Sequence, residues 1–205
     1  MKTPALRRKS GFTLVELLVV IAIIAVLATT AFSVGMGAIE KAKRTTALST
    51  ATSLVSSVNN FFTDYGTMPV AATSDTTYTT NTTDATGVAL VNALMGLEPS
   101  TASPLYNTRG VKYFTAREGK SDKNGVIFTT GSTAIVQGLY DPWGGPFLIR
   151  LDCDYDEKID VKTAAGSTKT LNGTRVAVWT NGADCTGLPG SSSPGKVTDD
   201  VTTWK

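Results

Sequence analysis

The chain has 205 residues, of which 41% are hydrophobic and 18% are charged, and its formal net charge at pH 7 is +2. This length fits one compact domain with an appended segment. The small net charge gives no indication of nucleic-acid binding. Histidine is absent, which excludes any mechanism that needs a histidine base or metal ligand.

The apolar residues are concentrated in the first 40 positions, behind a short basic leader. Four basic residues precede Phe12, and no acid does: Lys2, Arg7, Arg8 and Lys9. Residues 17–39 then carry no charge, which is about 23 positions where roughly 20 suffice to cross a bilayer as a helix. The helical pattern continues past this run, which favours a membrane anchor over a cleaved secretory signal. The positive-inside rule places the leader in the cytoplasm, although the bases within 41–44 reduce the charge asymmetry.

Glu16 is the acid at the start of this apolar segment. A carboxylate in hydrocarbon is costly unless a positive group neutralises it. The stretch G-F-T-L-V-E at 11–16, placed after a basic leader, closely resembles the N-terminus of type IV pilins and type II secretion pseudopilins. The resemblance implies that a prepilin peptidase cleaves between Gly11 and Phe12 and methylates the new amine of Phe12. It also implies that Glu16 neutralises that amine on a neighbouring subunit and so fixes the register of assembly. A plain signal anchor is the alternative.

The helix is expected to continue well beyond the membrane segment. Six apolar residues recur at helical spacing: Ala47, Ala51, Leu54, Val58, Phe61 and Tyr65. Gly66 is expected to cap this helix and Pro69 to stop it. Gly35 and Gly37 each cost about 1 kcal/mol in a helix interior, so we expect the helix to bend or unwind there on assembly.

The rest of the chain reads as short elements joined by turns. Residues 70–87 are rich in threonine and predict a surface loop, and residues 87–99 predict a short amphipathic helix. Strand-like runs follow at 111–115, 125–130, 146–152 and 175–179. Short connections favour antiparallel pairing. The predicted fold is therefore α+β, a long N-terminal helix packed on a small antiparallel sheet.

Three further motifs narrow the resemblance. The stretches DPWGGPF at 141–147, VWTNGADC at 178–185 and DDVTTW at 199–204 resemble the major pseudopilin of type II secretion. The resemblance implies a leader at 1–11 that is removed, a transmembrane polymerisation helix at 12–39, and a periplasmic globular domain at 40–205. The second half of the long helix, 40–65, belongs to that domain.

The function implied by the resemblance is structural, and the chain is not expected to be an enzyme. The subunit is expected in the inner membrane, with its N-terminus cytoplasmic and its C-terminal domain periplasmic. It would polymerise into a periplasmic filament that helps to push folded proteins through an outer-membrane secretin. The implied partners are other copies of the chain, the prepilin peptidase, the inner-membrane assembly platform with its ATPase, and minor pseudopilins. No nucleic-acid partner is expected.

Two other functions stay open. A type IV pilin would form a surface fibre for adhesion, motility or DNA uptake, and it shares the same kind of N-terminal segment. A membrane-anchored binding domain that never polymerises would be indifferent to the loss of Glu16.

The resemblance also implies calcium in the C-terminal loop. The matching positions are Asp184, Asp199 and Asp200, and carboxylate oxygens in a flexible loop suit Ca²⁺. Cys185 stands where the family usually has glycine, so a disulfide can here provide the order that calcium provides elsewhere.

A weaker metal candidate lies in DCDYDEKID. Four acids occupy positions 1, 3, 5 and 9 of an EF-hand-like spacing: Asp152, Asp154, Asp156 and Asp160. Positions 6 and 12 are Glu157 and Thr163, where the loop needs glycine and an acid. A charged hairpin tip with its acids in solvent is therefore the preferred interpretation.

The two cysteines, Cys153 and Cys185, predict one disulfide in an oxidising compartment. It would close a loop of about 30 residues and stabilise the fold by ~3 kcal/mol if unstrained. Two buried free thiols are the alternative.

Overall fold

The structure is a computed structural model. It describes residues 11–129, 134–162, 167–184 and 199–204, with the backbone alone for 30–35. The chain divides into two compact units, Met1–Ala42 and Lys43–Lys205, and helix α1 (Leu14–Tyr65) contributes to both.

In the first unit, α1 begins with a capping box formed by Thr13 and Glu16. The Glu16 amide donates to Thr13 Oγ1 at 3.2 Å, while the Thr13 amide and hydroxyl donate to Glu16 Oε2 at 2.8 and 2.7 Å. The pair satisfies amides that the first turn of a helix leaves without partners. The side chains of 14–29 are exposed, Leu14 by 80% and Ile21 by 57%. Over the described residues, no helix combines the length and the apolar character that crossing a membrane requires.

In the second unit, α1 buries the apolar face predicted from its spacing. Ala47, Ala51, Leu54, Val58 and Phe61 are each exposed by 1% or less. The helix ends at Tyr65, and Gly66 follows with a φ of +72° and donates its amide to the Phe62 carbonyl at 2.7 Å. A positive φ favours glycine because it has no Cβ, so the predicted cap is confirmed.

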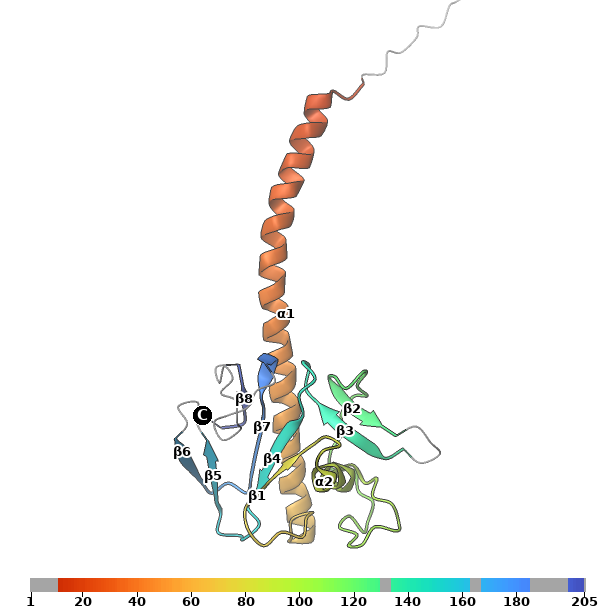
Figure 1. Cartoon of the computed structure of the whole chain (residues 1–205), viewed down its shortest axis with the longest axis vertical. Coiled ribbons are helices and arrows are strands. Elements are labelled where there is room, and N and C mark those ends of the chain that lie inside the picture. The colour runs from red at the N-terminus through yellow and green to blue at the C-terminus, as the bar shows by residue number, and fades with distance from the viewer. Residues whose placement is uncertain (1–10, 130–133, 163–166, 185–198, 205) are drawn as a thin grey trace, which may run out of the picture. The chain divides into compact units, whose positions relative to one another are not determined.

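A four-stranded antiparallel sheet packs against this part of α1, in the strand order β1-β4-β7-β8 (Figure 1). Its strands are β1 (Thr76–Thr79), β4 (Phe147–Leu151), β7 (Val176–Thr180) and β8 (Val201–Thr202). Phe147, Ile149 and Leu151 of β4 are buried at alternate positions, and they join Leu54 and Phe61 of α1 in one core cluster. This arrangement confirms the predicted α+β fold, with a long N-terminal helix and a small antiparallel sheet.

Helix α2 (Ala85–Met95) and a hairpin complete this core. Asp84 caps α2 by accepting the amides of Thr86 and Gly87 at 3.0 Å each, and Gly96 ends it in the left-handed conformation. The hairpin consists of β2 (Gly125–Phe128) and β3 (Val136–Tyr140). The short helix predicted at 87–99 is thus confirmed.

A third pair of strands, β5 (Lys158–Lys162) and β6 (Thr168–Asn172), carries a smaller cluster. Ile159 and Val161 of β5 pack with Ala177 of β7, and Trp204 lies against this cluster. The rings of Trp179 and Trp204 meet edge to face at 5.5 Å, which holds the end of the chain against β7.

Two local predictions are wrong. The threonine-rich segment 70–87 is not only a surface loop, since β1 lies within it and pairs with β4. Tyr78 supplies the buried side chain there at 5% exposed, and threonine fits a strand well. Residues 111–115 form no strand; the amides of Tyr113 and Phe114 both donate to the Leu94 carbonyl at the end of α2, at 2.9 Å.

Candidate functional site

The predicted processing site lies ahead of α1. Gly11 and Phe12 precede the helix, Phe12 is exposed by 77%, and no described residue other than its chain neighbour comes within 4 Å of the Cβ position of Gly11. A peptidase can bind such an exposed, non-helical bond without first unfolding the chain. The basic residues of the leader lie outside the described residues.

Glu16 sits in the first turn of α1, directly after this bond. Its Oε2 accepts the amide and hydroxyl of Thr13, so the carboxylate faces the start of its own helix. Partial positive charge at a helix N-terminus favours an acid there. The geometry places a hydrogen-bonded carboxylate within a few residues of the amine that cleavage would create on Phe12.

The C-terminal acids meet around a short 3₁₀ turn, η1 (Gly182–Asp184). Asp199 Oδ2 accepts the amides of Ala183 and Asp184 at 3.0 and 3.1 Å. Gly182 has a φ of +68°, and a Cβ there would lie 2.3 Å from the Asp199 carbonyl. The two segments can approach this closely only because position 182 is glycine.

Several side-chain oxygens in this loop are buried without a donor. Asn181 Oδ1, Asp199 Oδ1 and both carboxyl oxygens of Asp200 have no hydrogen-bond partner among the described residues. Buried polar atoms normally find a partner, and oxygen atoms alone are the ligands that Ca²⁺ prefers. The residues present therefore fit a calcium ion, and Asn181 Oδ1 is a candidate oxygen ligand that the sequence prediction did not include.

Among the described residues, Arg44 of α1 is a base near this loop. Its Nη2 donates to the Asp200 backbone carbonyl at 3.3 Å, and its charge lowers the pKa of the Asp200 carboxyl without outweighing burial and the acidic neighbours. Burial, together with repulsion from Asp199 and Asp184, raises the pKa of Asp200 to about 7. A bound cation would offset this repulsion.

The predicted disulfide is untested. Cys153 is a buried thiol exposed by 2%, and Cys185 lies outside the described residues.

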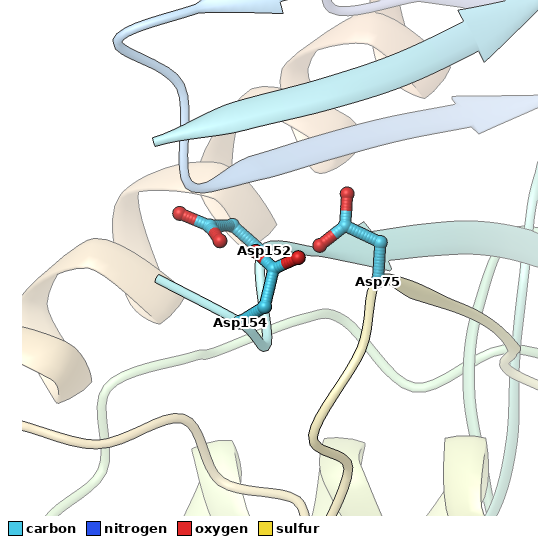
Figure 2. Close-up of side chains that lie close together, drawn as sticks. All are labelled: Asp75, Asp152 and Asp154. Carbon is cyan, nitrogen blue, oxygen red and sulfur yellow. The ribbon is translucent and has the colours of Figure 1, made fainter. Parts of the chain in front are cut away.

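The interpretation of the second acid cluster as a hairpin tip with its acids in solvent is wrong for Asp152, which is fully buried, and the structure divides the cluster. Asp152 and Asp154 lie together with Asp75, which precedes β1 (Figure 2). Asp156 instead accepts the Lys158 amide at 2.8 Å, and Asp160 accepts the Thr170 hydroxyl at 2.6 Å across the β5–β6 hairpin.

Sequence reasoning missed three residues of these sites. Thr13 could have been found, because T-x-x-E before an apolar run is the pattern of a capping box. Asp75 carries no such local signal, since it reaches Asp152 only through the pairing of β1 with β4. Asn181 reaches Asp199 and Asp200 in the same way, through the pairing of β7 with β8.

Comparison with known proteins supports the N-terminal assignment. The family model of the prokaryotic N-terminal methylation motif matches residues 6–32. No curated protein and no solved structure matched the chain. The matched motif is that of type IV pilin-like proteins, which include pseudopilins and pilins and are in general structural rather than catalytic.

Proposed function

We propose that this type IV pilin-like protein is a structural subunit of a type II secretion pseudopilus. The observation that carries the proposal is the methylation motif over residues 6–32, with Glu16 hydrogen-bonded at the start of its helix. The subunit is anchored in the inner membrane with its C-terminal domain in the periplasm, and it assembles with other copies into a filament. The prepilin peptidase, an assembly platform with its ATPase, and minor pseudopilins act with it.

Processing prepares the subunit for assembly. Cleavage between Gly11 and Phe12 removes the basic leader and leaves a positive, then methylated, amine on Phe12. The Glu16 carboxylate of an adjacent subunit pairs with this amine when the apolar helices stack. A subunit out of register would leave both charges unpaired in an apolar environment, which is costly, so the pair selects one stagger.

The proposal includes a calcium site in the C-terminal loop. The ion would be held by Asp184, Asp199, Asp200 and Asn181. The support is that Asp199, Asp200 and Asn181 each have a buried side-chain oxygen with no hydrogen-bond partner among the described residues. When bound, Ca²⁺ supplies positive charge that the described part of the loop lacks. The loop residues then stay close to η1, which keeps the C-terminal segment in place beside Arg44.

A surface fibre of the type IV pilin kind is the second candidate. The motif at 6–32 suits both kinds of filament, so the C-terminal half must separate them. The acid pair in DDVTTW and its unpartnered oxygens favour the pseudopilin, whereas a disulfide between Cys153 and Cys185 would favour the pilin.

The first experiment tests processing and assembly together. Mass spectrometry of the protein from membranes should find a chain that begins at methylated Phe12. Glu16→Val should abolish filaments while the subunit is still cleaved. Thr13→Ala is the matched control, because it breaks the capping box but keeps the acid, so filaments should persist. Filaments from Glu16→Val, or a mature chain that keeps Met1, would refute the proposal.

A second experiment separates the two filaments. Deletion of the gene in its native host should leave folded exoproteins in the periplasm and leave surface fibres unchanged. Loss of surface fibres with normal secretion would instead identify a type IV pilin.

A further inference from the structure

Strand pairing brings together three acids that are far apart in the sequence. β1 and β4 pair antiparallel with Thr76 opposite Leu151. Asp75 precedes β1 and Asp152 follows β4, so this register sets the two acids opposite one another. Asp154 follows closely, and one oxygen from each of the three carboxyl groups lies within 4.8 Å of the others. Figure 2 shows the three side chains gathered where the two strands meet.

Asp152 is the buried member of this group, and only half of its carboxyl is satisfied. Its exposed fraction is 0%, and its Oδ2 accepts the Glu157 amide at 3.0 Å. Its Oδ1 is buried and receives no hydrogen bond within the described part of the chain. A buried carboxylate oxygen without a donor is costly. Asp75 and Asp154 cannot donate to it while ionised, whereas a cation can bind all three groups.

Within the described part of the chain, Arg150 offsets the charge of the three acids only in part. Arg150 lies nearby, but its Nη1 donates to the Thr77 hydroxyl at 3.3 Å. Burial, with repulsion from Asp154 and Asp152, raises the pKa of Asp75, although Asp75 accepts the Cys153 amide and Arg150 acts in the opposite direction. Burial also raises the pKa of Asp152, and Asp154 adds to this effect, whereas the backbone amides of Glu157 and Tyr155 act in the opposite direction.

We propose that Asp75, Asp152 and Asp154 form a second divalent-cation site, separate from the C-terminal loop and suited to Ca²⁺. Three carboxyl groups supply hard oxygen ligands, and Asp154 is exposed, so water can complete the coordination. A partly open site of this kind binds calcium with a dissociation constant on the order of 10⁻⁴–10⁻³ M.

The site would fix the loop that holds the chain as it leaves α1. Tyr155 lies in the loop between β4 and β5, and its hydroxyl accepts the Met68 amide at 3.2 Å. The Tyr155 ring also lies 6.0 Å from the ring of Phe62 on α1. A cation shared by Asp75 and Asp152 therefore links the start of β1, the end of β4 and the end of α1.

Calcium titration calorimetry on the full chain in mild detergent tests the site. The titration is run in an Asp200→Asn background, which removes the C-terminal loop site. Asp75→Asn and Asp154→Asn are each added to that background; Asp75→Asn keeps an oxygen to accept the Cys153 amide. Asp156→Asn is the matched control, because Asp156 lies in the same loop but outside the group. Near-ultraviolet circular dichroism confirms that each variant folds, and the exposed position of Asp154 makes its variant the safer one.

The expected result is that D200N binds one calcium ion. Adding D75N or D154N to D200N should abolish this binding or weaken its affinity at least tenfold, and adding D156N should leave the affinity unchanged. A D200N chain that binds no calcium up to ~10 mM would overturn the site, since this exceeds the range of extracellular calcium modules. Binding that survives both D75N and D154N would also overturn it. If wild type and D200N each bind one ion, the inferred site stands and the C-terminal loop site fails, so the two can be told apart.

Discussion

Asp141 at the start of the DPWGGPF turn is the residue whose loss should destabilise the fold most directly. Its side chain is fully buried, and its Oδ1 accepts the amides of Trp143, Gly144 and Gly145 at 2.8, 2.7 and 2.8 Å. Its Oδ2 accepts the hydroxyl of Thr180 on β7. One carboxylate thus closes the turn and joins it to the central sheet.

The cost of Asp141→Ala follows from the donors that it leaves behind. The Gly145 amide and the Thr180 hydroxyl are buried, and each unsatisfied buried donor costs about 1–3 kcal/mol. Trp143 and Gly144 are half-buried, so their amides can donate to water instead, and losing their hydrogen bonds to Asp141 costs less. We expect a loss of about 3–4 kcal/mol in the free energy of unfolding. Asp141→Asn keeps an oxygen for the three amides and should lose about 1–2 kcal/mol.

Urea unfolding of the full chain in mild detergent, followed by tryptophan fluorescence at fixed calcium, measures this difference. Asp160→Ala is the control, since Asp160 is exposed and should change stability by no more than about 0.5 kcal/mol. An Asp141→Ala protein within about 1 kcal/mol of wild type would show that the turn holds without its carboxylate. So would equal losses for Asp141→Ala and Asp160→Ala.

Three more outcomes are expected. Leu54→Ala, at a fully buried position of α1, should cost about 2–5 kcal/mol in urea unfolding, and a loss below 1 would argue against a packed helix–sheet core. With a chelator present, stability should fall by a few kcal/mol as pH rises from about 4 to about 7, because the pKa of Asp200 is about 7 when folded and about 3.9 when unfolded. Asp200→Asn should flatten that profile, and an unchanged slope would remove Asp200 as its source. Non-reducing mass spectrometry should find Cys153 joined to Cys185, and two alkylatable thiols would show that no disulfide forms.

The parts of the fold that sequence predicted well are those set by local pattern. The buried face of α1 follows from residues spaced by three and four, and Gly66 marks the end of the helix because the positive φ there favours glycine. The strands β4 and β7 carry dense apolar runs; β4 falls within the predicted 146–152, and β7 begins within the predicted 175–179 and extends one residue beyond it, to Thr180. Helical period and β-branched runs are signals within one segment, so a single sequence contains them.

The missed parts depend on pairing between distant segments. β1 carries one large apolar residue, Tyr78, and becomes a strand because it pairs with β4. For the same reason, spacing in the sequence predicted Asp156 and Asp160 as partners of Asp152. In the structure, the pairing of β1 with β4 instead brings Asp75, 77 positions away, next to Asp152. Spacing along the chain predicts ligands only where they come from one loop.

In the single subunit, the Glu16 carboxylate already accepts hydrogen bonds from the amide and hydroxyl of Thr13 in its own chain. The carboxylate of an unassembled subunit is therefore not left without hydrogen-bond donors. In the proposed filament, pairing of Glu16 with the Phe12 amine of a neighbour would exchange the Thr13 donors for that amine. The pair would then contribute the difference between two sets of contacts, rather than the full cost of a carboxylate that starts without any partner.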